Sequence, residues 1–163
     1  MRTMYDSVTP LISVPKDAQM VGYYLNGQFA VKSVAGVYLA FKGASHVPID
    51  VNGGRSDYAR VLDVERGAAT PGQCEKWISE FNAVNPAFHT GARPVIYVQK
   101  SNISAVRAGT GRYRLGHDYF LWVASWGAPY SGFGVVACQV ENTPAWDRSE
   151  VYSDRWMPTA LRA

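Results

Sequence analysis

Short apolar runs, separated by glycine, proline and asparagine, recur along the whole chain. Eight of these runs predict β-strands, at residues 4–8, 20–25, 46–51, 60–65, 94–99, 119–124, 134–140 and 147–152. Most of them are continuously apolar and do not alternate with polar residues. This pattern is typical of strands covered on both faces, as in parallel sheets.

The segment after the fourth run carries the clearest helical signal. Thr70 suits the N-cap, Pro71 suits the first helical position, and Gln73 is placed to return a hydrogen bond to the cap. Apolar residues then recur at helical spacing until Pro86 ends the pattern, namely Cys74, Trp77, Ile78 and Phe81.

Two further helices are predicted from weaker patterns. One has its apolar positions at Val31, Val34, Ala35, Tyr38 and Leu39 and ends near Gly43. The other is shorter, begins near Ser101 and includes Ile103 and Val106.

The alternation of predicted strands and helices indicates an α/β fold. Eight complete strand–helix units need about 250 residues, with about 200 as the lower bound, and this chain has 163. Either several helices are replaced by loops, as at residues 50–60 and 126–134, or the sheet is open. We predict a single domain over residues 1–163, built as a small, modified (β/α)8 TIM-like barrel with several helices shortened or replaced by loops.

Composition and charge exclude several classes of protein. Apolar residues make up 47% of the chain and charged residues 18%, which is the balance of a folded globular domain. The net charge of +3 is not concentrated in any run of lysine or arginine, so nucleic-acid binding is not expected. No stretch approaches the roughly 18 apolar residues of a membrane span, and the first residues contain no apolar core of a secretory signal. We therefore expect no membrane partner and a cytoplasmic location at synthesis.

The cysteines and histidines predict no metal centre. Cys74 and Cys138 each lie in an apolar pattern, so we interpret them as buried free thiols. His46, His89 and His117 are scattered without ligand spacing. We expect neither a metal ion nor a cofactor.

Acidic residues at predicted strand ends carry the candidate chemistry. Asp63 and Glu65 lie two residues apart at the end of the fourth run, so both side chains point to the same face. Ligands bind at the carboxyl ends of parallel strands, and neighbouring carboxyl groups raise one another's pKa. This pairing favours a general acid beside a charged partner, as in glycoside hydrolysis. The alternative is that Asp63 and Glu65 are solvated side chains at a strand end and have no catalytic role.

Other polar residues take comparable positions on other predicted strands. Asp6 belongs to the first run and Asp147 to the eighth, and these two strands are neighbours in a closed barrel. Asp50 ends the third run. Gln139 lies at the end of the seventh, where it is placed to donate a hydrogen bond to a sugar hydroxyl.

The order of these motifs resembles the family 25 glycoside hydrolases, the Chalaropsis-type lysozymes. It resembles still more the shorter glycoside-hydrolase-like barrel domains of actinobacteria and their phages. The matching segments span nearly the whole chain in order, and they include Tyr5-Asp6-Ser7, Val21-Gly22-Tyr23, Leu62-Asp63-Val64-Glu65, Pro94-Val95-Ile96-Tyr97-Val98, Leu121-Trp122-Val123-Ala124, Ala137-Cys138-Gln139-Val140 and Trp146-Asp147-Arg148-Ser149.

The resemblance implies a peptidoglycan hydrolase of the muramidase type, which cleaves between N-acetylmuramic acid and N-acetylglucosamine. Glu65 would be the proton donor, and Asp63 would stabilise the N-acetyl group or the oxocarbenium-like centre. Asp6 and Asp147 would frame the pocket floor and tune the pKa values of the other two. Sugar contacts would come from Gln139, Trp122, Tyr97 and Tyr23, although the three aromatic residues suit a barrel core equally well.

Two classes of function remain open after this comparison. In the first, the chain hydrolyses cell-wall glycan at the bacterial wall, as a phage lysis or tail-associated enzyme. In the second, it is a catalytically degenerate barrel that serves as a virion structural or decoration protein, with other virion subunits as partners, or as a glycan-binding module. A basic, aromatic patch at Arg107, Arg112, Tyr113 and Arg114 is either a solvated loop or a contact for an anionic polymer or another subunit.

Overall fold

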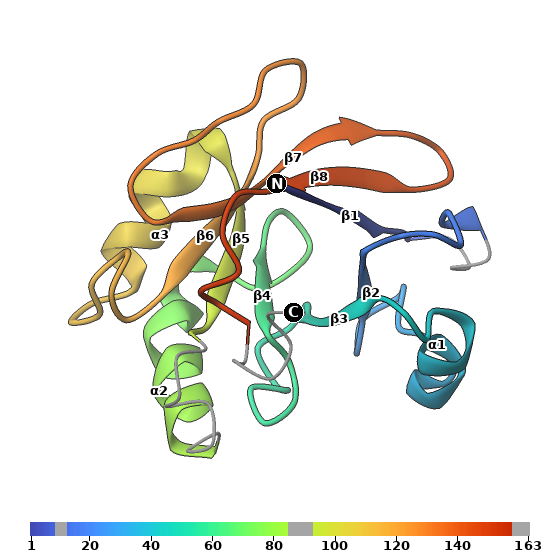
Figure 1. Ribbon diagram of the computed structural model, residues 1–163. Coiled ribbons are helices and arrows are strands. Elements are labelled where there is room, and N and C mark those ends of the chain that lie inside the picture. The colour runs from blue at the N-terminus through green and yellow to red at the C-terminus, as the bar shows by residue number, and fades with distance from the viewer. Residues whose placement is uncertain (9–12, 85–92, 158–163) are drawn as a thin grey trace.

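The computed structural model describes residues 1–8, 13–84 and 93–157. Eight strands form a closed barrel in which each strand neighbours the next along the chain (Figure 1). The strands are β1 (Arg2–Asp6), β2 (Met20–Tyr24), β3 (Ser45–Asp50), β4 (Val61–Val64), β5 (Val95–Gln99), β6 (Phe120–Ala124), β7 (Val135–Asn142) and β8 (Asp147–Val151). Each lies within two residues of its predicted bounds, and the closed barrel excludes the open sheet.

The barrel is mixed in strand direction. Strands β1 to β7 run parallel to one another, whereas β8 is antiparallel to both β7 and β1. A short turn is sufficient for an antiparallel connection, while a parallel one needs a crossover. Residues 143–146 therefore join β7 to β8 without a helix. The last strand closes the barrel at little cost in chain length.

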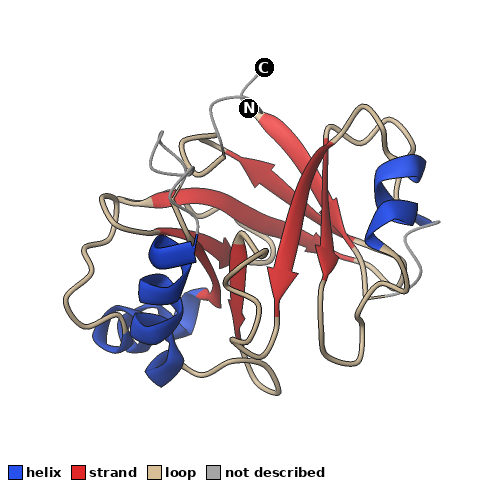
Figure 2. Cartoon of the chain, turned by 90° about the horizontal axis from the view of Figure 1, so that it is seen from below, coloured by secondary structure: helices blue, strands red, loops and turns tan. Residues whose placement is uncertain are grey.

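Three α-helices lie outside the barrel among the described residues, α1 (Val34–Ala40), α2 (Cys74–Val84) and α3 (Ile103–Gly109). Short 3₁₀ turns, η2 (Pro71–Gln73) and η4 (Lys100–Asn102), lead into α2 and α3. Helices α2 and α3 pack together on one side, and α1 lies on the opposite side (Figures 1 and 2). The structure shows an eight-stranded α/β barrel, but not the complete strand–helix alternation of a TIM barrel. None of these helices is long and apolar enough to cross a membrane.

The predicted capping signal before α2 is present. The backbone N–H of Thr70 donates to Oε1 of Gln73 at 2.8 Å, as in a capping box. The predicted apolar positions of α2 are all buried, and they are Cys74, Trp77, Ile78 and Phe81. The helix is described to Val84, and the predicted stop at Pro86 lies outside the described residues, as does His89.

Helix α1 is shorter than predicted and presents a different face to the barrel. It begins after Ser33, whose Oγ accepts from the N–H of Gly36 at 3.0 Å. Its one buried residue is Val37, whereas Tyr38 is 46% and Leu39 68% exposed. The periodicity identified the helix, but it did not identify the buried side, because apolar residues lie on more than one face.

Side chains alternate between the barrel interior and its outer surface along the strands, except where the register of β7 shifts against β6 and β8. The interior core is filled largely by residues from the strands, including Met4, Met20, Val61, Val95 and Trp122. One outer cluster joins β4, β5 and β6 to α2 and α3, and a second joins β2 to α1. Both faces of these strands are therefore buried, which explains the continuously apolar runs of the sequence.

Candidate functional site at the barrel mouth

Four carboxyl groups from three strands of the barrel gather where β1 and β4 end. We call Asp6, Asp63, Glu65 and Asp147 the acid centre. Asp6 is the last residue of β1, Asp63 belongs to β4, and Glu65 is the first residue after β4. Electrostatic coupling links Asp6 to Asp147, Asp63 and Glu65, and also links Glu65 to Asp63 and Asp147.

The antiparallel direction of β8 brings Asp147 to this end of the barrel. Asp147 is the first residue of β8 and is paired in register with Asp6, the last residue of β1. In a parallel eighth strand the first residue would lie at the opposite rim. The contact between Asp6 and Asp147 therefore depends on strand direction.

Asp6 and Asp63 are the buried members of the acid centre. They are 3% and 4% exposed. Burial raises the pKa of Asp6 to about 8, with further increases from Asp147 and Glu65 and a decrease from a Tyr24 hydrogen bond. Burial also raises the pKa of Asp63 to about 8, together with the charges of Glu65 and Asp6. Both groups therefore hold a proton at neutral pH.

Glu65 and Asp147 are only partly buried and lie at the solvent side of the centre. Burial raises the pKa of Glu65 above its ordinary value. Burial and the Glu65 charge raise the pKa of Asp147 to about 6, against a hydrogen bond with Gln139 that lowers it. The arrangement thus places two partly exposed acids of raised pKa beside two buried acids that are protonated at neutral pH.

Two tyrosines and a glutamine surround the carboxyl groups. The Tyr24 hydroxyl donates to Oδ1 of Asp6 at 3.2 Å. The Tyr97 hydroxyl donates to Oε1 of Gln139. Burial and the four nearby carboxyl groups raise the pKa of Tyr97, so its hydroxyl stays protonated and serves as a donor.

The acid centre contains buried oxygens without a hydrogen-bond partner among the described residues. They are Oδ2 of Asp6, Oδ1 of Asp63 and Oδ1 of Asp147. Buried polar atoms are normally paired, and exceptions concentrate at functional sites. Three such oxygens therefore lie together in the acid centre.

Two of the predicted sugar-contacting residues lie elsewhere. Trp122 is 2% exposed in the barrel interior, and its indole Nε1 donates to Oγ of Ser149 at 3.0 Å. Tyr23 is fully buried against α1, on the outer face of β2. Both are core residues, whereas Tyr97 and Gln139 do reach the acid centre. Successive side chains of a strand point to opposite faces. Tyr24 faces the interior and contacts Asp6, so Tyr23 faces outward and lies away from the acid centre.

Sequence reasoning did not identify Tyr24 or Gly22. Both point inward from β2, and a Cβ on Gly22 would lie 2.8 Å from Cβ of Asp6. Gly22 therefore provides the space that Asp6 occupies. Tyr24 is the last residue of β2, and its position at the carboxyl end of a strand was the signal that would have identified it.

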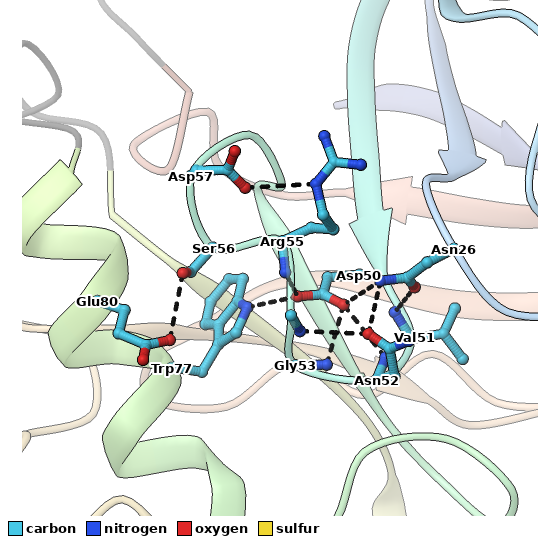
Figure 3. Close-up of polar contacts among 11 residues, drawn as sticks. Asn26, Asp50, Val51, Asn52, Gly53, Arg55, Ser56, Asp57, Trp77 and Glu80 are labelled. Carbon is cyan, nitrogen blue, oxygen red and sulfur yellow. Dashed lines mark hydrogen bonds and ion pairs between the residues drawn. The ribbon is translucent and has the colours of Figure 1, made fainter.

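Asp50 is a buried carboxylate with a different role. Its two oxygens accept five hydrogen bonds, and every donor lies within 3.1 Å (Figure 3). The donors are Nδ2 of Asn26, the backbone N–H groups of Asn52, Gly53 and Arg55, and Nε1 of Trp77. This carboxylate fixes the β3–β4 loop and α2 against the barrel, and it has no free oxygen lone pair directed at a ligand.

Metal ligation is not supported within the described part of the chain. No group of three or more histidine, cysteine, aspartate or glutamate side chains there is arranged to hold a metal ion. Cys74 and Cys138 are buried free thiols, as predicted.

Comparison with known proteins supports the fold only. No protein-family model matches the chain, and no curated protein does. Among solved structures, the chain is similar to an uncharacterized protein from B. stearothermophilus, with a TM-score of 0.63. The two chains are 14% identical, and the match covers 97% of this chain and 99% of the other. The barrel architecture therefore extends over essentially the whole of both chains.

Proposed function

We propose that this barrel is a glycan-strand hydrolase of the muramidase type, acting on bacterial peptidoglycan by carboxylate acid/base chemistry. The observation that carries the proposal is the convergence of four carboxyl groups from β1, β4 and β8 at one rim of the barrel, with raised pKa values. In this proposal the fold is a shortened form of the (β/α)8 barrel, which keeps its ligand site at the carboxyl ends of the parallel strands.

Glu65 is the proton donor in this proposal. Like Asp147, it is partly exposed and has a carboxyl pKa raised by burial, and it directly follows the strand that carries the protonated Asp63. A donor of this kind must be protonated at working pH and must reach the glycosidic oxygen. Asp6 and Asp63 are too deeply buried to touch a polymer, and their protonated carboxyl groups lie behind the other two as the inner part of the site.

Asp147 is the ionised partner in this proposal. With a pKa of about 6 it is largely a carboxylate at pH 7, and a negative charge beside the sugar stabilises an oxocarbenium-like transition state. Gln139 lies between Asp147 and Tyr97 and orients a sugar hydroxyl. The direct contact with the N-acetyl group that the resemblance implies for Asp63 does not fit this burial, because the side chain is only 4% exposed.

The Glu65→Gln variant tests the proposal directly. We expect it to release reducing ends from purified actinobacterial peptidoglycan about 10²- to 10⁴-fold more slowly than the wild type, because general acid catalysis contributes that factor. Glu75→Gln is the matched control, since Glu75 is an exposed residue of the outer helix α2. Equal rates for wild type and Glu65→Gln, or an inactive wild type, would rule the proposal out.

A degenerate barrel is the second candidate, and one observation favours it. Tyr24 and Tyr97 lie at the acid centre and already donate to Asp6 and Gln139. A site filled by its own side chains suits a glycan-binding module or a virion structural protein with little turnover. Sedimentation with insoluble peptidoglycan distinguishes the two: this candidate predicts retention of the chain on the pellet, or assembly with virion subunits, without release of reducing ends.

A further inference from the structure

A cavity lies on the outer side of the barrel, away from the acid centre. It has a volume of about 450 Å³, within the range of small-molecule sites. The residues around it come from α3, from the segment before β6, and from the β6–β7 connection, and they are Ile103, Arg107, Tyr113, Arg114, Leu115, Tyr119, Leu121, Tyr130, Phe133 and Val135. None of them belongs to the acid centre.

The cavity exists because the β6–β7 connection has no helix. Strands β6 and β7 are parallel, and a parallel pair normally has a crossover helix over its outer face. Residues 125–134 cross over without one. Leu121 and Val135, which are paired in register on neighbouring strands, therefore form the apolar floor of a cavity.

The walls of the cavity are aromatic. Tyr113, Tyr119, Tyr130 and Phe133 line it. Phe133 packs over Gly116, where a Cβ would lie 2.7 Å from the ring, and still remains 81% exposed. Exposed aromatic surface at a cavity edge is stabilised when a flat apolar ring covers it.

The charge around the cavity is positive. Arg107 lines it and has no ion pair with any described residue. Nζ of Lys100 lies 5.1 Å from the centre of the Tyr130 ring. Arg114 also lines the cavity, but its Nε pairs with Oδ2 of Asp118 at 3.4 Å. An unpaired guanidinium at an apolar cavity favours a ligand that brings its own negative charge.

We propose that this cavity binds a small, flat aromatic ligand with one anionic group, its ring between the aromatic walls and its anion on Arg107. A carboxylate and a phosphate share this chemistry. The site is independent of the proposed hydrolase activity, because it shares no residue with the acid centre.

Calorimetric titration with paired probes tests the proposal. The carboxylate pair is 2-naphthoate and neutral 2-naphthalenemethanol, and the phosphate pair is adenosine monophosphate and adenosine. We expect at least one anion to bind about 10-fold more tightly than its neutral partner, or about 1.4 kcal/mol. The anion that binds identifies whether the natural ligand carries a carboxylate or a phosphate. Amide chemical shifts of Leu115 and Val135 should move on binding.

Three variants locate the binding. Arg107→Gln should weaken binding of the anion about 10-fold and leave the affinity for the neutral probe unchanged. The control Arg66→Gln, at an exposed arginine outside the cavity, should leave both affinities unchanged. Phe133→Ala removes an exposed wall without disturbing the core and should weaken both members of the bound pair. Failure of both anions to bind, equal affinity for charged and neutral probes, or wild-type affinity in Arg107→Gln would each overturn the proposal.

Discussion

Asp50 and Asp63 are buried aspartates on adjacent strands of one barrel, yet their surroundings are opposite. Asp50 lies on the outer face of β3, where its side chain accepts five hydrogen bonds from a loop and from α2. Asp63 lies on the inner face of β4, where its Oδ1 has no partner among the described residues and where burial and two other carboxyl groups raise its pKa. The Asp50 side chain stabilises the fold, whereas the surroundings of Asp63 disfavour its ionised form.

The difference comes from strand parity and from the donors available on each face. An outward-facing carboxylate at this rim meets backbone N–H groups of the loop that turns back toward the barrel. An inward-facing one meets the side chains of other strands, which here are mainly acids and tyrosines. Five donors satisfy the buried oxygens of Asp50, whereas burial of Asp63 without donors favours its protonated form.

The largest effect is expected for Asp50→Asn. The substitution preserves shape but turns one acceptor oxygen into an NH₂ group, which must then face donors. We expect a loss of about 3 kcal/mol in the free energy of unfolding, measured by urea denaturation at pH 7. Asp57→Asn is the control at an exposed position and should cost less than about 0.5 kcal/mol. A loss of similar size in both variants would show that Asp50 is not a structural anchor.

The same substitution at Asp63 should have the opposite sign. The pKa of Asp63 is about 8 in the folded chain against an ordinary 3.8. The unfolded chain therefore binds fewer protons between these values, and this group makes stability fall as pH rises from about 4 to about 8. Asp63→Asn removes that loss. We therefore expect the free energy of unfolding of the variant to be at least about 1 kcal/mol higher than that of the wild type at pH 9.

The comparison at pH 5 provides the internal control for Asp63→Asn. Most of the difference in the free energy of unfolding between variant and wild type should be absent at pH 5. At that pH the Asp63 carboxyl group is protonated in the folded chain, and only a small part of the loss of stability has occurred. A variant that is less stable than the wild type at pH 9 would contradict the assignment of Asp63 as an unsupported buried acid.

Tyr24→Phe should have the smallest effect. It removes the hydroxyl that donates to Asp6 at 3.2 Å and that lowers the pKa of this carboxyl. We expect the pKa of Asp6 to rise by about half a unit, which corresponds to about 0.7 kcal/mol. Carbon-13 NMR titration of the Asp6 carboxyl measures it. An unchanged or lowered pKa would show that Tyr24 does not stabilise the ionised form.

The helices and strands were largely predictable from the sequence, whereas the residues of the acid centre and its surroundings were predictable only in part. Eight apolar runs became eight strands because both faces of the parallel strands are covered. Asp6, Asp63, Glu65 and Asp147 were chosen because acids at strand ends are exceptional in an apolar pattern. Continuous apolar runs carry no information on which face points inward, so they do not show that Tyr24 faces the acid centre and Tyr23 faces α1.

The sequence by itself determined where strands begin and end, which helix is capped at Thr70, and which acids lie at strand ends. These properties depend on residues that are close together along the chain. Only the tertiary structure decided that β8 is antiparallel and so pairs Asp147 with Asp6. It also decided that Asp50 faces five donors while Asp63 faces other acids. Whether a carboxyl group is ionised depends on its neighbours in space, and closing the barrel is what selects them.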